Sequence, residues 1–329
     1  MGHDMPTASS EPRGERGPVV IAGGSGALGT ALVDDLTARG VEVVVLTRRP
    51  AAGLRHRQVA WDGRTLGPWV AELDGCAGVV NLAGRLVDAR PTAANIADLR
   101  ASRVDSTRAL VLASQQLARP VPRWLQASTT AIWSDAGEAR LDETSPLPDP
   151  GLPQMTGVAR PWEEAVEGAN ADHVVVVRTS IVLARDTPAL DRLLLLARLG
   201  LGGQVGEGRQ WFSWIHVQDW LTIARAALGL EPELDLGPGV VVAAAPNPVR
   251  NAELMAILRR ASRRRFGLPT PAPLLRLGAL ALRTDPALAL TGRHTTSRVL
   301  AEAGMTWRFP TLTDAVDDLV GPRPAPPGH

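Results

Sequence analysis

The chain has 329 residues, of which 45% are hydrophobic and 21% charged, a composition typical of a globular protein with one large domain or two unequal ones. The net charge of +1 provides no strong field, so we expect a small-molecule substrate as the partner and neither a nucleic acid nor a membrane. The sequence contains no tyrosine, and all 35 basic residues are arginine, which excludes mechanisms that need a tyrosine phenolate, a Schiff-base lysine or a phosphate-loop lysine. The single cysteine, Cys76, excludes an internal disulfide and a multi-cysteine metal site, and we expect no metal.

Both ends of the chain are predicted to lie outside the folded part. Residues 1–16 are polar and lack the apolar stretch of a signal peptide, so we expect a disordered tail. Residues 321–329 are rich in proline and glycine and are predicted to fray. No run of residues reaches the about 18 consecutive apolar positions of a membrane span. Because the sequence shows no targeting signal, the cytoplasm is the expected compartment.

The first part of the chain alternates between short apolar runs and segments of helical periodicity. Apolar runs of this kind predict strands buried on both faces, as in a parallel sheet covered by helices. The expected fold class is therefore α/β, with a Rossmann doubly wound parallel sheet. The predicted strands are 18–22, 41–46, 58–61, 78–82, 122–128 and 173–177, and the predicted helices are 27–39, 93–117 and 161–169.

The pattern changes after about residue 185 and predicts a smaller, mostly helical C-terminal lobe. We expect the Rossmann domain to comprise residues 17–248, including a substrate loop at 186–212, and the C-terminal substrate lobe to comprise residues 249–320. The predicted elements are a helix at 190–199, a glycine-rich loop at 200–210, a strand at 214–217, a helix at 219–228, a strand at 239–245, and helices from 251 onward with a proline-rich break at 268–273.

A glycine-rich loop joins the first predicted strand to the first predicted helix. Gly23, Gly26 and Gly29 permit a tight turn, close approach of backbone N–H groups to a pyrophosphate, and close packing of the helix on the sheet. This context predicts a dinucleotide-binding site, although a simple glycine turn is the alternative interpretation. The predicted cofactor-binding residues of the loop are Gly23, Gly24, Ser25, Gly26, Ala27, Leu28 and Gly29.

The second predicted strand ends in Thr47, Arg48 and Arg49, where an NAD-selective site usually has a carboxylate. Arginine instead suits a 2′-phosphate, so the sequence predicts NADP(H), although solvated surface arginines are the alternative. Asp62 follows the third strand and is predicted to accept from the adenine amino group. The turn after the fourth strand is predicted to pass along the cofactor's ribose and phosphates, and it comprises Asn81, Leu82, Ala83 and Gly84.

These motifs resemble those of the extended short-chain dehydrogenases/reductases, and more narrowly an atypical branch of NAD(P)-dependent epimerase-family proteins with a C-terminal domain of unknown function. The resemblance covers roughly residues 18–320 and implies a Rossmann domain that binds a nicotinamide dinucleotide, with the substrate held against the C-terminal lobe. It also implies that Arg103, Arg178 and Ser180 lie on the cofactor side. The matching stretches are GGSGALG (23–29), TRR (47–49), WDG (61–63), NLAG (81–84), SRVDST (102–107), RTSIVLA (178–184) and GLGGQVGEGRQWFSWIHVQD (200–219).

The resemblance also shows that the usual acid–base pair is missing. Most short-chain dehydrogenases use Tyr-x-x-x-Lys, in which the lysine lowers the pKa of the phenol that moves the proton. Here Met155 and Ala159 stand at those positions, and one register over lie Thr156 and Arg160 at i, i+4 spacing. We expect Met155 and Thr156 to contact the substrate, but a threonine is a poor proton donor.

Several other residues are candidates for the substrate site. Ser128 and Thr129 end a predicted strand, where they could polarise the substrate or cap the backbone. Trp133 is predicted to form an apolar wall over the nicotinamide or the substrate. In the glycine-rich loop, Arg209 and Gln210 are predicted to bind a substrate anion or carbonyl.

Other charged residues have both catalytic and structural interpretations. His216 is a candidate general base because its usual pKa lies near neutrality, or else a structural, hydrogen-bonded histidine. Asp219 is predicted to cap the next helix. Glu163 and Glu164 are predicted in a first helical turn, where they favour the helix dipole, unless desolvation makes one an acid. The arginine run 259–265 is predicted to be a solvated helix face rather than a nucleic-acid patch.

The sequence therefore favours an NADPH-dependent reductase of a small organic substrate, such as an iminium ion or a conjugated alkene, that needs little help from a protein acid. Two alternatives remain open: a non-redox isomerase, cyclase or epimerase that uses the same crevice, and a non-catalytic NADP(H)-binding sensor. The sequence leaves the oligomeric state open between monomer and homodimer.

Overall fold

The computed structural model describes residues 17–321 except 52, 54–55, 88–89, 272, 274–284 and 286, and without the side chains of 188, 189 and 288. The tails predicted at 1–16 and beyond 321 lie outside the described residues, as does part of the proline-rich break.

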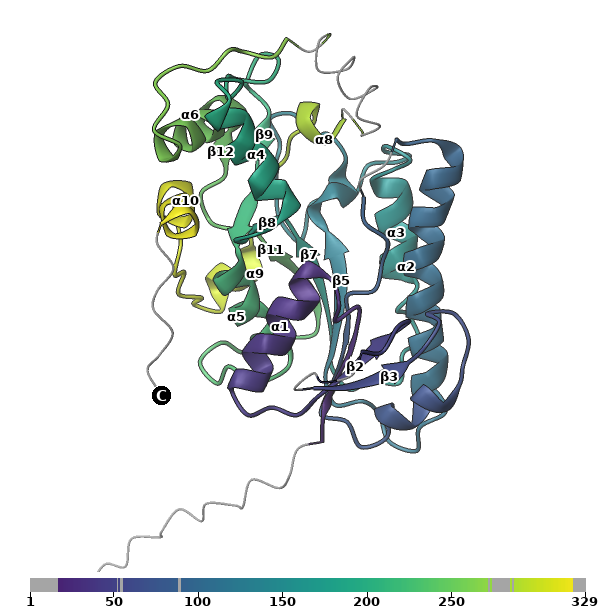
Figure 1. The fold of residues 1–329 in the computed structure, drawn as a ribbon. Helices are drawn as coiled ribbons and strands as arrows, with labels where there is room; N and C mark the ends of the chain where they lie inside the picture. The colour runs from purple at the N-terminus through teal and green to yellow at the C-terminus, as the bar shows by residue number, and fades with distance from the viewer. Residues whose placement is uncertain are drawn as a thin grey trace, which may run out of the picture.

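A seven-stranded, entirely parallel sheet forms the centre of the molecule (Figure 1). The strand order is β11-β7-β5-β4-β1-β2-β3, so the order reverses beside β1, where ligands bind in doubly wound sheets. The sheet confirms the predicted fold class. Its strands are β1 Val19–Ala22, β2 Val43–Thr47, β3 Arg57–Ala60, β4 Gly78–Asn81, β5 Trp124–Thr129, β7 Val174–Thr179 and β11 Gly239–Ala243.

The central strands form because both of their faces are covered by helices. Every residue of β1, β2 and β4 is buried, which explains their continuous apolar sequences. Figure 1 shows helices on both faces of the sheet. On one face lie α1 (Ala27–Ala38) and α5 (Val217–Ala227), and on the other lie α2 (Ala93–Ser114) and α3 (Thr156–Glu164).

Helix α3 differs from its prediction. The sequence predicted a helix over 161–169, with Pro161 at its start, but α3 begins at Thr156 and includes Pro161. A proline at the sixth position of a helix loses only one of the earliest intrahelical hydrogen bonds, so it does not prevent a helix that packs well. As a result, Glu163 and Glu164 lie in the last turn of α3, and the prediction that they favour the helix dipole in a first turn is wrong.

Short elements complete the Rossmann part and join it to the C-terminal lobe. The two-stranded ladders are too short to show a periodicity in sequence, and of their six strands only β10 coincides with a predicted strand, at 214–217. The ladders pair β8 (Ile181–Leu183) with β10 (Trp214–His216), β9 (Trp211–Phe212) with β12 (Val249–Arg250), and β6 (Arg140–Leu141) with β13 (His294–Thr295). Two 3₁₀ helices, η1 (Pro68–Leu73) and η2 (Thr130–Trp133), lie in the connections of the Rossmann part.

The C-terminal lobe has a hydrophobic core of its own, to which residues from Leu183 to Leu319 contribute. In Figure 1 most helices of the lobe stand together beyond one end of the sheet, whereas the helix at 298–302 lies against β11. No helix in the described part of the chain is long and apolar enough to cross a membrane. The helices of the lobe are α4 (Pro188–Arg198), α6 (Asn251–Ala261), α8 (Ala287–Leu290), α9 (Arg298–Glu302) and α10 (Leu312–Val320).

Candidate active site

The glycine loop between β1 and α1 packs so tightly that most of its glycines are required by the protein itself. Gly23 has a φ of +83°, and a Cβ there would lie 2.7 Å from the carbonyl of Leu82. A Cβ at Gly24 would lie 2.7 Å from the side chain of Val45, and one at Gly29 only 2.3 Å from the carbonyl oxygen of Gly23. The loop is therefore held against β2 and the turn after β4.

Gly26 differs from these glycines because the protein leaves room for a side chain there. A Cβ at Gly26 would meet no atom closer than the carbonyl oxygen of Gly23, at 3.4 Å, and the φ of −77° suits any residue. Gly26 is the N-cap of α1, and no side chain caps this helix. The first N–H groups of α1 are thus left for a ligand, and the positive end of the helix dipole suits a pyrophosphate. The residues present fit a dinucleotide.

The end of β2 carries two exposed arginines, Arg48 and Arg49. Neither forms an ion pair with any residue in the described ranges. Asp62, also exposed, accepts from the N–H groups of Arg64 and Thr65 at 2.8 Å and from the Thr65 hydroxyl at 2.6 Å. These hydrogen bonds lower the pKa of Asp62 to about 2. Asp62 therefore shapes its own turn, and its contact with adenine stays a prediction.

Asn81, predicted to contact the cofactor, is fully buried, and its side chain forms hydrogen bonds within the protein. Its amide nitrogen donates to Thr107 Oγ1 at 2.8 Å and to Gln126 Oε1 at 3.0 Å, while its Oδ1 accepts from the N–H of Ala83 at 3.1 Å. All the hydrogen-bonding atoms of this carboxamide are thus occupied. Any contact of this turn with a nucleotide is left to the backbone of residues 82–84.

Arg103 reaches from α2 to the same turn. A Cβ on Gly84 would lie 3.2 Å from its guanidinium, which donates to the carbonyls of Leu99 (3.1 Å) and Arg85 (3.0 Å) and stacks 5.1 Å from the ring centre of Trp162. Burial lowers the pKa of Arg103 to about 10. The guanidinium thus joins α2, the turn after β4 and α3, beside the position predicted for the cofactor.

A buried hydrogen-bond network joins the carboxyl ends of β5 and β7 to α3. The Ser128 hydroxyl donates to Glu163 Oε1 at 2.5 Å, and Arg178 donates to both oxygens of Glu163 at 2.8 Å. Ser128 and Arg178 are neighbours across the two strands. The Arg178 guanidinium also lies 4.9 Å from the ring centre of Trp133. A bidentate guanidinium–carboxylate pair of this geometry is strong and directional.

This network changes four of the predicted roles. Ser128 gives its proton to Glu163, so it is not a free donor for a substrate. Arg178 binds Glu163 and Trp133, which accounts for its burial without the cofactor contact that the resemblance implied. Trp133 is itself buried among protein residues, with its Nε1 directed to the carbonyl of Ser145 at 3.4 Å. Glu163 is an acceptor in all three bonds and is not placed to donate a proton.

Thr129 is the predicted hydroxyl that keeps a proton to give. Its Oγ1 accepts from the N–H of Ala131 as the N-cap of η2, which is the capping alternative recognised in the sequence. Its side chain is half-buried. Ser180, in contrast, is buried and donates to the carbonyl of Ala243 at 2.8 Å, so it joins β7 to β11 rather than contacting the cofactor.

The positions of the missing acid–base pair are apolar or fully engaged. Met155 and Ala159 are buried. Thr156 is also buried, and its hydroxyl lies 2.7 Å from the carbonyl of Ile132 and 2.6 Å from Ser134 Oγ. The prediction that Thr156 contacts the substrate is wrong, because both its donor and its acceptor are used inside the protein.

Arg293, which sequence reasoning missed, lies beside Met155. Its Nη1 donates to the carbonyl of Ser134 at 2.5 Å and lies 3.4 Å from Met155 Sδ. Burial lowers the pKa of Arg293 to about 10, against the attraction of Asp135. Its position between the C-terminal lobe and the N-cap of α3 depends on a contact across 138 residues, which no local pattern could reveal.

His216 and Asp219 are structural. His216 is the N-cap of α5: its Nδ1 accepts from the N–H of Gln218 at 3.1 Å, its Nε2 lies 3.4 Å from the Asp318 carboxylate, and its ring packs on Phe309. Burial lowers the pKa of His216 to about 4, against the attraction of Asp318. These contacts favour the structural interpretation of His216 over its assignment as a catalytic base.

Asp219 does not cap α5, contrary to the prediction. Its two carboxylate oxygens accept from the N–H groups of Arg308 (2.8 Å) and Phe309 (3.0 Å). Burial of the side chain raises the pKa of Asp219. Asp219 therefore fastens the segment before α10 to a helix of the Rossmann part.

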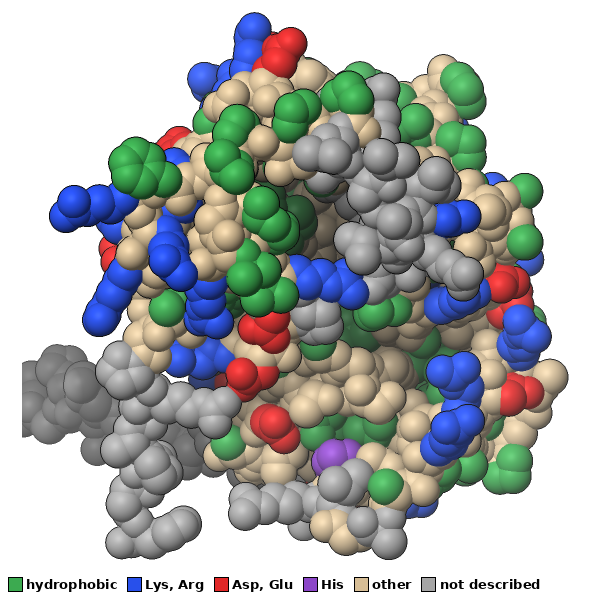
Figure 2. Space-filling model, turned by 45° about the horizontal axis from the view of Figure 1, so that its top comes forward, with side chains coloured by type: hydrophobic (Ala, Val, Ile, Leu, Met, Phe, Trp, Pro, Cys, Tyr) green, Lys and Arg blue, Asp and Glu red, His purple; other side chains and the backbone are tan. Residues whose placement is uncertain are grey.

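The glycine-rich loop lines a cavity of about 530 Å³ in the C-terminal lobe, with Arg209, Gln210 and Leu290 among its walls. Arg209 is exposed there, and its contact with a substrate stays a prediction. Gln210 instead uses its amide nitrogen on the carbonyls of Val205 (3.1 Å) and Ala289 (2.9 Å), so it braces the loop and has only its oxygen left for a substrate. Figure 2 shows a hollow in this part of the molecule, with hydrophobic side chains in its depth and arginine side chains at its edge.

The fold and the glycine loop define a Rossmann-type nucleotide-binding protein. A model of the NAD dependent epimerase/dehydratase family matches residues 19–237, and the chain belongs to this family. It is 31% identical to the human epimerase family protein SDR39U1 over 92% of this chain and 99% of the relative. This agrees with the resemblance to an atypical extended short-chain dehydrogenase/reductase.

Solved structures show the same relationship. The human SDR39U1 structure, solved with NADPH, superposes with a TM-score of 0.80 at 30% identity, over 92% of this chain and 99% of that one. A nucleoside-diphosphate sugar epimerase from Corynebacterium glutamicum superposes with a TM-score of 0.72 at 28% identity, over 92% of this chain and 58% of that one.

Proposed function

We propose that the protein is an NADP(H)-dependent reductase of a small organic substrate. The observation that carries the proposal is the uncapped start of α1 at Gly26, combined with two exposed arginines after β2 that have no acidic partner among the described residues. The first feature suits a dinucleotide pyrophosphate, and the second suits a 2′-phosphate. The NADPH in the human relative's structure supports the same choice of cofactor.

The residues around the crevice limit the chemistry of the substrate. When bound, the cofactor supplies a hydride. The protein has no phenol, and the hydroxyls of Ser128 and Thr156 are engaged with other protein atoms. Thr129 is the strand-end hydroxyl with a proton to share, and it is a weak acid. A substrate whose acceptor carbon is already activated, such as an iminium ion or a conjugated alkene, needs no strong acid from the protein.

The site would bind rather than protonate its substrate. Arg209 lines the cavity of the C-terminal lobe, and the guanidinium of Arg293 stands beside Met155. Both supply positive charge on the lobe side of the crevice, which favours a substrate with an anionic or strongly polar group.

A titration of the purified protein with NADPH and NADH, followed by fluorescence, tests the cofactor assignment. A panel of carbonyls, imines and enones is then added, and NADPH oxidation is followed by absorbance. We expect tighter binding of NADPH than NADH and turnover of imines or enones. Equal affinity for the two nucleotides would contradict the 2′-phosphate assignment, and turnover of simple ketones alone would contradict the substrate class.

The engaged hydroxyls of Ser128 and Thr156 also favour a second candidate, a non-catalytic NADP(H) sensor. Binding of NADPH with no turnover across the panel would support the sensor. Conversion of a substrate without net NADPH oxidation would support the non-redox isomerase or epimerase instead.

A further inference from the structure

Two segments of the C-terminal lobe together carry six arginines and no carboxylate. They are residues 195–204, from the end of α4 into the glycine-rich loop, and residues 259–270, from the end of α6 onward. None of the six forms an ion pair with any residue of the described chain. These arginines are Arg198, Arg259, Arg260, Arg263, Arg264 and Arg265.

The two segments lie side by side although they are distant in sequence. The N–H of Leu268 donates to the carbonyl of Gly200 at 2.8 Å, and the N–H of Gly203 donates to the carbonyl of Leu268 at 3.1 Å. Arg259 reaches across and donates to the carbonyl of Gly202 at 2.6 Å. The charges of both segments therefore belong to one surface, which we call the arginine–leucine patch and define as residues 195–204 and 259–270.

The patch also exposes large hydrophobic side chains. Phe266 is 87% exposed, Leu268 68% and Leu199 64%. Leu195, Leu196 and Leu201 are exposed as well. Side chains of this size are usually buried, and a gathering of them at a surface rimmed by polar residues is typical of an interaction site. In Figure 2, hydrophobic and basic side chains alternate over the part of the lobe where Figure 1 places α4 and α6.

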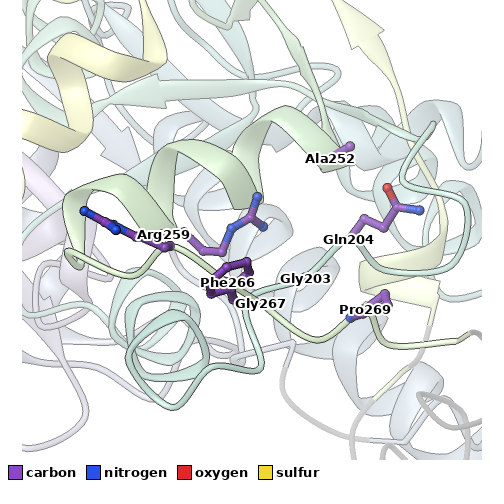
Figure 3. Close-up of a pocket in the computed structure, with 8 residues that line it drawn as sticks. Gly203, Gln204, Ala252, Arg259, Phe266, Gly267 and Pro269 are labelled. Atoms are coloured by element: carbon purple, nitrogen blue, oxygen red, sulfur yellow. The ribbon is translucent and has the colours of Figure 1, made fainter.

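Within the patch lies a hollow of about 360 Å³ whose walls include Arg259, Arg265 and Phe266. Figure 3 shows Arg259 extending from α6 beside Phe266 and Gly267, with Gln204 and Pro269 on the two loops at the other end. The hollow has room for a small charged group, and guanidinium groups bind phosphate oxygens well.

We propose that the arginine–leucine patch docks the protein on an anionic lipid surface. Phe266 and the leucines would enter the boundary between headgroups and acyl chains, and the arginines would bind the headgroup phosphates. A symmetric second copy fits poorly, because a two-fold interface would bring two sets of six unpaired arginines together. A single-stranded nucleic acid fits poorly too, because Phe266 is the only exposed aromatic of the patch and provides no stacking series. The net charge of +1 predicted no membrane partner, but it sums the charges of the whole chain and does not reveal the local excess of arginine in the patch.

Co-sedimentation with lipid vesicles tests the proposal. The full chain is mixed with vesicles of phosphatidylcholine alone or of equal parts phosphatidylcholine and phosphatidylglycerol. We expect it to sediment only with the anionic vesicles, and less at high salt. Each arginine near the surface contributes roughly five-fold to the partition coefficient, so R264Q/R265Q should lower it about 25-fold. Phe266→Ser should lower it about ten-fold, because an inserted aromatic ring is removed.

Matched controls come from other parts of the surface. Leu112→Ser removes an exposed leucine of α2, and R108Q/R119Q removes two exposed arginines outside the patch. We expect both to sediment like the unmodified protein. No sedimentation with anionic vesicles, or an equal loss in the control variants, would overturn the proposal. Binding of the patch to polyglutamate but not to vesicles would assign it to an acidic protein partner and overturn the lipid surface.

Discussion

At the scale of single residues, the predicted cofactor site consists mainly of the backbone of the glycine loop and the two arginines after β2, and not of reactive side chains. Gly23, Gly24 and Gly29 are fixed by contacts within the protein, whereas Gly26 is free of such contacts. Arg48 and Arg49 have no acidic partner among the described residues. We therefore expect substitutions at Gly26 and Arg48 to affect ligand binding, and a substitution at Gly29 to affect folding.

Replacing Arg48 by alanine should weaken NADPH binding about ten-fold and leave NADH binding nearly unchanged, because only NADPH has a 2′-phosphate to pair with the guanidinium. Fluorescence titration of both nucleotides measures the difference. Arg119→Ala removes an exposed arginine elsewhere and should change neither affinity. Equal losses for NADPH and NADH in Arg48→Ala would refute the assignment.

Replacing Gly26 by alanine should weaken both nucleotides about ten-fold or more, because the added methyl group stands where the backbone must approach the pyrophosphate. The melting temperature should stay within about one degree of the original value, since the protein leaves room at this position.

Gly29→Ala is the contrasting variant. Its Cβ would lie 2.3 Å from the Gly23 carbonyl oxygen, so we expect a loss of roughly 2 kcal/mol or more in the free energy of unfolding. A Gly26→Ala protein that melts as early as Gly29→Ala would show that Gly26 is required for folding and not for the ligand.

At the scale of secondary structure elements, buried polar contacts determine how helices are fixed to the sheet. Glu163 joins α3 to the ends of β5 and β7 through Ser128 and Arg178. His216 caps α5 and packs against Phe309. In both cases the residue type suggested catalysis, and the tertiary contacts show a structural role.

Glu163→Leu should destabilise the protein by about 3 kcal/mol or more, because Arg178 then stays buried without its counter-charge. The double variant E163L/R178M should recover most of this loss, since an apolar pair of similar volume avoids the burial of both charges. Chemical denaturation of the two single variants and the double variant measures the coupling. Additive losses would contradict the pairing.

Stability should also depend on pH through His216. Its pKa is about 4 in the folded protein and near its usual 6.5 when unfolded, so between these values the unfolded chain binds more protons. The free energy of unfolding should therefore fall as pH falls from 6.5 to 4, by about 2–3 kcal/mol.

His216→Asn isolates this contribution, because asparagine keeps the N-cap but does not titrate. Urea denaturation at pH 7 and pH 5 should show a smaller difference for the variant than for the unmodified protein. The same difference in both would exclude His216 as the titrating group.

At the scale of the whole molecule, polar contacts between distant segments hold the lobe and the Rossmann part together. Asp219 on α5 accepts from two backbone N–H groups before α10, and Arg185 donates to the carbonyls of Asp318 and Gly321 at the end of that helix. These contacts fix α10 and the segment before it against the rest of the molecule.

Asp219→Ala should lower the free energy of unfolding by about 2–4 kcal/mol, because it leaves two N–H groups near Phe309 without an acceptor. Asp219→Asn keeps one carbonyl oxygen and should lose about half as much. Urea denaturation followed by tryptophan fluorescence measures both losses. An unchanged Asp219→Ala protein would show that these two hydrogen bonds do not contribute to stability.

The sequence by itself determined the parallel α/β fold, the dinucleotide loop, the arginines after β2 and the absence of a Tyr–Lys pair. These are local properties: strand and helix periodicity, the spacing of glycines, and residue types that are present or missing. Only the tertiary structure decided the roles of Ser128, Thr156, His216 and Asp219, and it revealed Arg293. Their partners lie between 2 and 159 residues away, and a periodic pattern carries no information about which distant group will meet a given hydroxyl, carboxylate or guanidinium.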